Sequence, residues 1–226
     1  MSFGTLYMVA TPIGNLSDIS NRALDILRGA DVILAEDTRV TKKLSSRFNV
    51  DTPIVSFHSH SGEEKKLKIL KRLIEGDSVA LVTDAGTPGI SDPGNELIDY
   101  LLQKEPLINV VPIPGASAIT AALSICGFDV NKFVFLGFFP KKKRSKLLLE
   151  LSQAKRAYVF YESPNRLLRT LESLREHVGE TRRVFIGREL TKMYEETFRG
   201  ELNEVINQIK AKDPRGEVVV VVEKLR

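Results

Sequence analysis

The chain has 226 residues, of which 42% are hydrophobic, a formal net charge of +4 and a single cysteine, Cys126. This length allows one large domain or two small ones, with enough apolar residues to bury a core. One cysteine excludes an internal disulfide framework and a cysteine-based zinc site. The sequence contains no run of about 18 apolar residues and no signal-peptide pattern at its N-terminus. These features predict a soluble cytoplasmic protein without a membrane span.

The charges are unevenly distributed along the chain. Residues 1–114 contain 12 Lys and Arg against 15 Asp and Glu, whereas residues 115–226 contain 21 against 14. An acidic first part joined to a basic second part indicates that the second part contacts an anionic partner. Chance variation is the alternative explanation.

Strand-like and helix-like segments alternate through the first part of the chain. Strands are expected at residues 6–10, 32–35, 53–57, 79–82 and 108–111, each followed by a helical pattern. The expected helix caps are Ser17 or Asp18 for residues 19–27, a capping box at 61–64, and Asp92 after the fourth strand. Five strand–helix units predict a mostly parallel sheet with helices on both faces.

The second part of the chain has a different pattern. Strands are expected at residues 132–138, 157–161, 182–187, 195–199 and 217–223, with helices between several of them. The last of these strands is an uninterrupted valine run, which predicts a central position, and the second part is expected to be a mixed α/β domain. Two prolines and a glycine at residues 112–115 mark a boundary. The predicted fold class is therefore α/β, with an N-terminal domain at 1–114 and a C-terminal domain at 115–226.

A loop rich in Gly, Pro, Thr and Asp occupies residues 83–94, between an expected strand and an expected helix. Loops at the carboxyl ends of strands are where open α/β sheets bind their ligands. Glycines allow a ligand to approach the backbone, and N–H groups near a helix start favour an anionic group. An ordinary strand-to-helix turn is the alternative.

Several familiar catalytic motifs are absent from the sequence. No Gly-x-Gly-x-x-Gly follows the first strand, and no P-loop occurs. The Gly-x-Ser-x-Gly elbow fails at Ile119, its last position. His58 and His60 are interpreted as polar surface because no third metal ligand is obvious. No metal site is expected.

Five motifs occur in an order that resembles a known family. They are Met8-Val9-Ala10-Thr11-Pro12-Ile13-Gly14-Asn15-Leu16, Ala35-Glu36-Asp37-Thr38-Arg39, Asp84-Ala85-Gly86-Thr87-Pro88-Gly89-Ile90-Ser91-Asp92-Pro93-Gly94, Phe160-Tyr161-Glu162-Ser163-Pro164 and Gly187-Arg188-Glu189-Leu190-Thr191-Lys192. Together they resemble the ribosomal RNA small subunit methyltransferase I family, cytidine-2′-O-methyltransferases of the tetrapyrrole methylase superfamily. The resemblance extends from residue 6 to residue 222. It implies two α/β domains, S-adenosylmethionine bound in the cleft between them, and a homodimer.

The resemblance also implies which residues contact the cofactor. The implied positions are Pro12, Asp84, Ala85, Gly86, Thr87, Pro88, Ile90, Ser117, Ala118, Tyr161, Leu190 and Glu217. The alternatives are structural: the prolines can simply shape turns, Tyr161 can belong to the core, and Leu190 can be ordinary apolar packing.

The implied reaction is an in-line transfer of the sulfonium methyl group to a ribose 2′-oxygen. The protein then mainly aligns the nucleophile about 3 Å from the methyl group. A positioned base could add about 10²–10⁴-fold. The candidate catalytic residues are Glu36, Asp37, Glu189 and Lys192. Their alternative role is salt bridging, for example with Arg39 or Arg188.

The implied partner is ribosomal RNA or the small ribosomal subunit. Candidate RNA contacts lie beside Phe138 and Phe139 and are Lys141, Lys142, Lys143, Arg144 and Arg166. A solvated helix start is the alternative. Family members often carry a further helical segment after the second domain, whereas this sequence ends at Arg226; we expect the cofactor site to be complete without it.

Two other functions remain open from the sequence. The first is a small-molecule methyltransferase of the same superfamily, acting on a tetrapyrrole or another acceptor. The basic second part favours RNA over such an acceptor. The second is a non-catalytic RNA-binding protein, which the elaborate loop at residues 83–94 disfavours.

Overall fold

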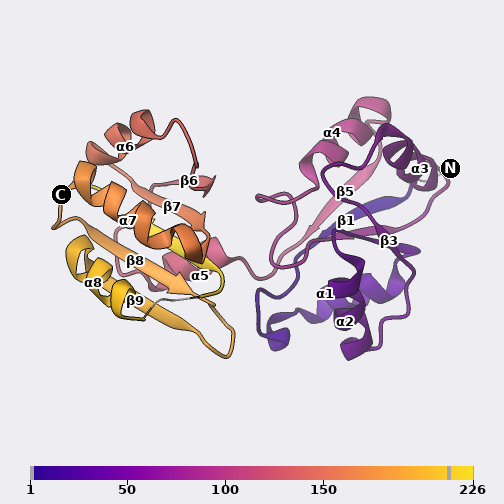
Figure 1. Cartoon of the computed structure of the whole chain (residues 1–226). Helices are drawn as coiled ribbons and strands as arrows, with labels where there is room; N and C mark the ends of the chain where they lie inside the picture. The colour runs from indigo at the N-terminus through magenta and orange to yellow at the C-terminus, as the bar shows by residue number, and fades with distance from the viewer. Residues whose placement is uncertain (1–2, 213–214, 226) are drawn as a thin grey trace. The chain divides into compact units, whose positions relative to one another are not determined.

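The structure, a computed structural model, describes residues 3–212 and 215–225. Its contacts divide the chain into two compact units, Met1–Ser117 and Ala118–Arg226 (Figure 1). The first unit thus extends to Ser117, whereas the sequence placed the boundary after residue 114. The hydroxyl of Thr87 donates a hydrogen bond to the carbonyl of Ala116 (3.2 Å), which fastens the end of this segment to the first unit.

The first unit contains a five-stranded parallel sheet in the order β3-β2-β4-β1-β5. Its elements are β1 (Thr5–Val9), η1 (Leu16–Asp18), α1 (Asn21–Gly29), β2 (Val32–Ala35), α2 (Thr38–Phe48), β3 (Ile54–Ser56), α3 (Glu63–Ile74), β4 (Val79–Val82), α4 (Asn95–Lys104) and β5 (Asn109–Ile113). The prediction of a parallel sheet is confirmed.

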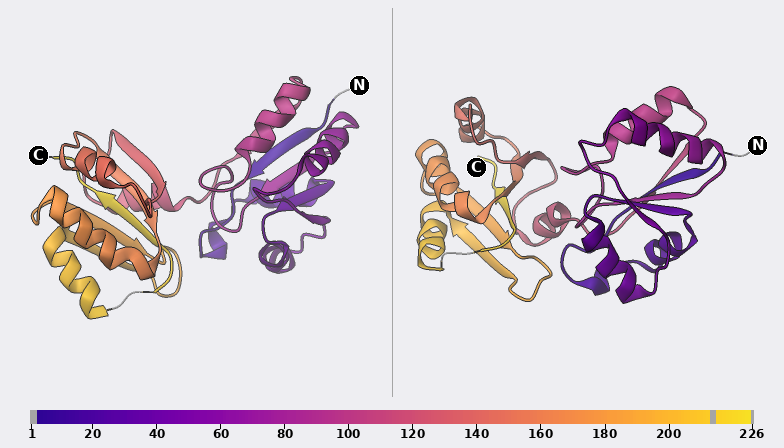
Figure 2. Two further views of the ribbon diagram at one scale, coloured as in Figure 1. Left: turned by 45° about the horizontal axis from the view of Figure 1, so that its top comes forward. Right: turned by 45° about the vertical axis from the view of Figure 1, so that its right-hand side comes forward.

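Helices cover both faces of this sheet, as expected. In β4, Val79 and Leu81 pack with α3 and α4, whereas Ala80 and Val82 pack with α1 on the opposite face. Figures 1 and 2 show α3 and α4 on one side of the strands and α1 and α2 on the other. Burial on both faces explains why these strands are continuous apolar runs rather than alternating ones.

The second unit contains a five-stranded mixed sheet in the order β6-β7-β10-β8-β9, in which only the β6–β7 pair is parallel. Its elements are α5 (Ala118–Ile125), β6 (Phe133–Phe138), α6 (Ser145–Ser152), β7 (Ala157–Glu162), α7 (Pro164–Val178), β8 (Arg183–Arg188), β9 (Glu196–Glu201), α8 (Leu202–Lys212) and β10 (Val218–Val222). All five valines of β10 are buried, and the strand is central, as predicted.

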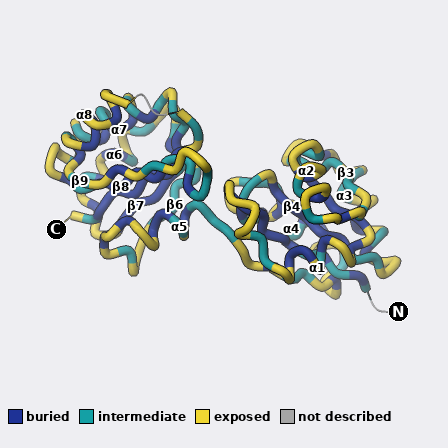
Figure 3. The backbone as a smooth tube through the Cα atoms, turned by 90° about the horizontal axis from the view of Figure 1, so that it is seen from below, coloured by how far each residue is buried: buried dark blue, intermediate teal, exposed yellow. Residues whose placement is uncertain are grey.

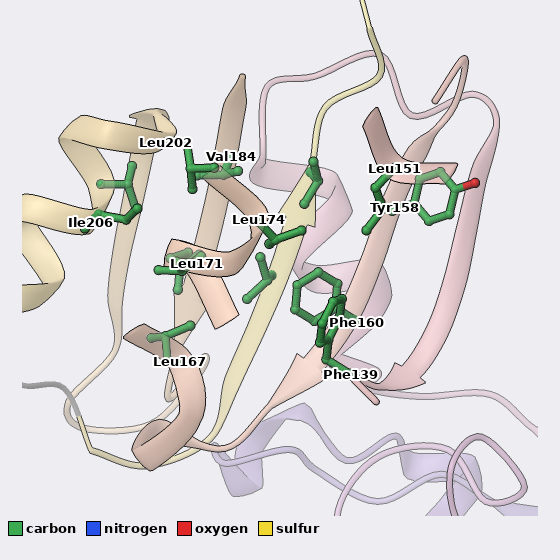
Figure 4. Packing of buried hydrophobic residues seen from close by; sticks show 14 of the residues in the cluster. Phe139, Leu151, Tyr158, Phe160, Leu167, Leu171, Leu174, Val184, Leu202 and Ile206 are labelled. Atoms are coloured by element: carbon green, nitrogen blue, oxygen red, sulfur yellow. The ribbon is translucent and has the colours of Figure 1, made fainter. Parts of the chain in front are cut away.

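The core of the second unit lies between this sheet and three helices. Phe160 of β7 packs against Phe139 with ring centroids 4.7 Å apart, and both are fully buried (Figure 4). Leucines of α6 and α7 and Val205 and Ile206 of α8 complete this cluster. The central strands β2, β4, β7 and β10 are almost wholly buried, whereas the edge strands β3, β6 and β9 are partly exposed (Figure 3).

The local predictions of two helix starts were wrong. Ser20 caps α1, because its hydroxyl accepts a hydrogen bond from Ala23 N–H (3.1 Å), while Ser17 and Asp18 belong to η1. No capping box forms at α3. The hydroxyl of Ser61 instead accepts a hydrogen bond from His58 N–H (3.0 Å), which closes the turn that precedes the helix.

The predicted start of α4 at Asp92 was also wrong. The helix begins at Asn95 with Gly94 as its N-cap. Residues 91–94 form bends and turns, and Ser91 adopts a left-handed conformation with φ of 64°. The loop after β4 therefore continues two residues beyond the expected cap at Asp92.

Candidate functional site

The loops after β1 and β4 are joined by their backbones. Thr11 N–H donates to the carbonyl of Gly86 (2.8 Å), and Gly86 N–H donates to the carbonyl of Thr11 (3.1 Å). The buried Thr11 hydroxyl also donates to the carbonyl of Thr83 (3.1 Å). These bonds hold the loop at residues 84–90 against the end of the first strand.

A third loop, between β5 and α5, lies beside the same position. Gly86 has a φ of +89°, and a Cβ atom there would lie 3.4 Å from Ile13 and 3.6 Å from the carbonyl of Ala116. Gly86 thus leaves space among three loops that follow three neighbouring strands. The structure places the segments that contain Pro12 and Ser117 beside residues 84–90, through the bonds of Thr11 with Gly86 and of Thr87 with Ala116.

The loop after β4 is also fastened to the loop after β2. The Asp84 carboxylate accepts a hydrogen bond from Asp37 N–H (3.0 Å). Asp37 in turn caps α2 and forms an ion pair with Arg39, with 2.6 Å between Oδ2 and a guanidinium nitrogen. The hydrogen bonds from Arg39 lower the pKa of Asp37 to about 2.

Glu36, immediately before Asp37, lines a pocket of about 260 Å³ within the first unit. Burial raises the pKa of the Glu36 carboxyl, the nearby Asp84 carboxylate raises it further, and His58 opposes both. The residues that line the pocket follow β2 and β3 directly, or belong to α3, α4 and the turn just before α4; they are Glu36, Phe57, His58, Ser59, Lys66, Ser91, Asp92, Pro93, Gly94, Asn95, Glu96 and Leu97.

Comparison with known proteins identifies the family. The profile of the tetrapyrrole (corrin/porphyrin) methylases matches residues 5–206. This chain belongs to that family. It is therefore a methyltransferase whose methyl donor is S-adenosylmethionine.

The relatives of this methylase include proteins named ribosomal RNA small subunit methyltransferase I. The one from Thermotoga maritima is 46% identical over 96% of this chain and 97% of its own length. The one from Halalkalibacterium halodurans is 47% identical over 97% of this chain and 76% of its own length. The chain is thus a member of this group within the family.

Solved structures of the family share the fold of this methylase. A cobalt precorrin-4 methyltransferase has a TM-score of 0.72 at 19% identity and covers 97% of this chain and 94% of its own. Uroporphyrin-III C-methyltransferase of Thermus thermophilus, complexed with S-adenosylhomocysteine, has a TM-score of 0.66 at 17% identity and covers 97% of each chain. The predicted tetrapyrrole methylase-like α/β fold is confirmed.

In the second unit of the methylase, three cofactor candidates gather at one end of neighbouring strands. Tyr161, near the end of β7, pairs with Val219 of β10, and Glu217 lies just before β10. Leu190 follows β8 and folds back over Gly187, whose added Cβ would be 3.0 Å from the leucine side chain. Tyr161 is partly buried and Leu190 is buried.

Two of the catalytic candidates form an ion-pair network at this same end of the sheet. The Glu189 carboxylate accepts hydrogen bonds from Glu217 N–H (2.7 Å) and from the Lys192 ammonium (3.0 Å), and Lys192 also pairs with the Glu217 carboxylate (3.0 Å). Burial would raise the pKa of Glu189, but these hydrogen bonds outweigh it and lower the pKa. Burial would lower the pKa of Lys192, but the two carboxylates raise it.

The salt bridges proposed as alternatives are partly different from those observed. Arg39 pairs with Asp37, as considered from the sequence. The guanidinium of Arg188 forms its ion pair with Glu196 of β9 at 3.4 Å, and acts on Glu189 only through its charge, which helps to lower the pKa of that carboxyl. The antiparallel register places Glu196 directly opposite Arg188, which local sequence spacing does not reveal.

Four of the RNA-binding candidates lie on the exposed turn between β6 and α6. Lys141, Lys142 and Lys143 are exposed and Arg144 is partly exposed. Arg166 differs, because its guanidinium contacts the buried Glu162 carboxylate (3.1 Å) and donates to the carbonyl of Phe139 (2.7 Å). Arg166 therefore fixes the chain just before the basic turn.

Sequence reasoning missed the role of His58 as a pocket residue and treated it as polar surface. Lys66 was not singled out. These residues surround Glu36 only because β3 and β4 flank β2 in the sheet, an order that local patterns do not encode.

Within residues 3–212 and 215–225, no group of three acidic, histidine or cysteine side chains could hold a metal ion, and no helix is long and apolar enough to cross a membrane.

Proposed function

We propose that this methylase transfers a methyl group from S-adenosylmethionine to the 2′-oxygen of a cytidine in small-subunit ribosomal RNA. The observation that carries the proposal is its near full-length similarity, at 46–47% identity, to relatives named for methylation of that RNA. The excess of Lys and Arg after residue 114 supports an RNA acceptor.

The loops of the first unit offer a suitable cofactor site. The bound cofactor supplies an electrophilic methyl group on a sulfonium centre. Residues 84–90 would hold it largely through their backbone, with Pro12 and Ser117 beside them. The Asp84 carboxylate complements a positively charged ligand, and the absence of a side chain at Gly86 leaves room against Ile13 and Ala116. Ala118, Tyr161, Leu190 and Glu217 are the other proposed cofactor contacts, as the family resemblance implies.

We propose that alignment, rather than a strong general base, carries most of the methyl transfer. A good base has a pKa near the working pH. Asp37, with a pKa of about 2, is far from that range, and the ion pairs lower the pKa of Glu189 and keep Lys192 protonated. These three residues would hold the loops in place so that the ribose oxygen meets the methyl group in line.

The basic turn would contact RNA phosphates while a neighbouring ring stacks on an unpaired base. Phe138 is 61% exposed, and the centroid of its ring lies 5.5 Å from that of the Tyr161 ring. Aromatic rings beside a run of Lys and Arg are typical of proteins that bind single-stranded nucleic acid. The proposed contacts are Lys141, Lys142, Lys143 and Arg144, with Arg166 holding the turn.

The proposed function also implies where the protein acts, and the family resemblance implies its oligomeric state. A methylase of ribosomal RNA would act in the cytoplasm on RNA or on an assembled small subunit. Homodimer formation, implied by the family resemblance, is proposed as its oligomeric state. Sedimentation velocity of the purified chain tests the dimer directly.

Calorimetric titration with S-adenosylmethionine and S-adenosylhomocysteine, without added metal, tests the cofactor site. Incubation of labelled S-adenosylmethionine with small subunits and with their extracted RNA then tests the acceptor. We expect the label in 2′-O-methylcytidine after digestion to nucleosides. Label confined to bases, or transfer to a tetrapyrrole acceptor in place of RNA, would contradict the proposal.

A further inference from the structure

The pocket beside Glu36 lies where the sheet opens at its carboxyl edge. The chain leaves β2 toward α2 on one face, whereas β3 and β4, the neighbours of β2, continue into α3 and α4 on the other face. The loops that leave these adjacent strands therefore turn in opposite directions. In open α/β sheets, such a divergence forms a crevice that binds ligands.

The pocket combines an apolar floor with a polar wall. Phe57 and Leu97 are almost fully buried and contribute apolar surface. Glu36 and His58 lie close enough for their charges to interact, and Lys66 pairs with Glu96 at 3.7 Å. A concave, mostly apolar site with a few converging polar groups is typical of small-molecule binding.

The pocket is adjacent to the proposed cofactor loop. Residues 84–90 continue directly into residues 91–97, which form one wall of the pocket. The hydrogen bond from Asp37 N–H to Asp84 holds the Glu36 segment against that loop. A group bound beside Glu36 would therefore lie next to the bound methyl donor.

The volume limits what the pocket can accept. Pockets for drug-sized ligands measure about 300–1,000 Å³. At about 260 Å³, this pocket has room for a single ring system with part of its sugar. A tetrapyrrole is several times larger than one nucleobase, so the pocket fits a nucleotide of an RNA chain better.

We propose that this pocket receives the unpaired base of the acceptor nucleotide and that Glu36 selects cytosine by hydrogen bonding to its Watson–Crick edge. The inference rests on the proposed function, because it assigns the base-recognition subsite of the same reaction. His58 lines the same wall and forms a second polar contact.

The hydrogen-bonding capacity of Glu36 explains the choice of base. Cytosine presents an amino group, which donates a hydrogen bond to a carboxylate. Uracil presents a carbonyl oxygen at the same position, which cannot donate. The ionised carboxylate only accepts, so it favours cytosine, whereas a protonated carboxyl would pair with either base. Enzymes that read an extruded base commonly contact its Watson–Crick edge in this way.

The test compares how tightly two nucleotides bind to the intact chain in the presence of S-adenosylhomocysteine. Affinities for cytidine 5′-monophosphate and uridine 5′-monophosphate are measured by calorimetry or by saturation-transfer NMR. We expect the cytidine nucleotide to bind about tenfold more tightly. In Glu36→Gln the preference should fall to about twofold or less, because an amide can donate to a uracil oxygen as well as accept.

Glu64→Gln is the matched control, since Glu64 pairs with Lys68 on the exposed surface of α3. It should keep the full preference, and both variants should retain wild-type affinity for S-adenosylhomocysteine. Equal binding of the two nucleotides by the wild-type chain, or an unchanged preference in Glu36→Gln, overturns the inference. Either result leaves methylation of RNA by the wild-type protein intact, whereas failure of the proposed function appears as absence of that methylation.

Discussion

The carboxylate of Asp84 accepts a hydrogen bond from the backbone N–H of Asp37 at 3.0 Å. The two residues are 47 positions apart in the sequence but follow adjacent parallel strands, β4 and β2. Asp84 also raises the pKa of Glu36. One side chain thus connects the proposed cofactor loop with the proposed base pocket.

Replacing Asp84 by Ala should weaken binding of S-adenosylmethionine at least tenfold and lower the free energy of unfolding by about 1 kcal/mol, the usual net value of such a bond. Asp84→Asn is the control, because its amide oxygen can still accept from Asp37 N–H. Asp84→Asn should retain stability and lower the pKa of Glu36. Calorimetry measures the cofactor affinity, urea unfolding the stability, and NMR titration the pKa of Glu36. An equal loss of stability in both variants would contradict the role of the hydrogen bond.

Gly216→Ala should disrupt the network around Glu189. Gly216 has a φ of +93°, and a Cβ atom would lie 2.5 Å from the Glu189 side chain. The backbone strain alone costs about 1–2 kcal/mol, and displacement of Glu189 also removes its bond to Glu217 N–H. We expect the free energy of unfolding, measured in urea, to fall by more than about 1 kcal/mol. Gly29→Ala, at a glycine with open space around it, should not show this loss.

Replacing Lys141, Lys142 and Lys143 together by Ala should weaken RNA binding and leave cofactor affinity unchanged. Each phosphate contact with a single strand contributes about 0.7 to the slope of log affinity against log salt. The triple variant should therefore lower that slope by about 2. Replacing Lys42, Lys68 and Lys71 of the first unit removes the same charge and should change the slope less. Equal loss of RNA and cofactor binding would exclude a specific role for the basic turn.

Arg39→Ala should raise the pKa of Asp37 from about 2 toward its ordinary value of 3.8. Because the folded-state pKa is below the ordinary value, the ion pair stabilises the fold above about pH 4, and this stabilisation is lost as the pH falls to about 2. The difference in stability between wild type and variant should disappear over that interval. Carboxyl NMR titration measures the pKa, and an unchanged Asp37 value in Arg39→Ala would contradict the assignment.

Arg166→Ala should destabilise the second unit rather than act only on RNA binding. The Glu162 carboxylate is fully buried and also accepts hydrogen bonds from Thr170 and from Ser163 N–H, each at 2.7 Å. Loss of the charged partner should lower the free energy of unfolding by about 1.5–3 kcal/mol, as measured by urea unfolding. Arg169→Ala is the matched control on the same helix. Weakened RNA binding with unchanged unfolding would instead favour direct contact of Arg166 with RNA.

The local patterns of the sequence were sufficient to predict the parallel sheet of the first unit and the central position of β10 in the second. Apolar runs such as Val79–Val82 and the valines of β10 report burial on both faces, because a strand covered on two sides has no polar face to alternate. The five ordered motifs also indicated the family. Helix starts were less accurate, since Ser17, Asp18, Ser20, Ser61 and Asp92 are all acceptable caps by composition and only long-range packing selects among them.

The sequence by itself determined the fold class and the family, because each depends on patterns of residues close together in the chain. Only the tertiary structure decided that β2 lies between β3 and β4, and hence that Glu36 shares a pocket with His58 and that Asp84 reaches Asp37. It likewise paired Lys192 with Glu189 and Glu217 and placed Arg188 opposite Glu196. The order of strands and the register between them arise from contacts between distant segments, which local periodicity does not specify.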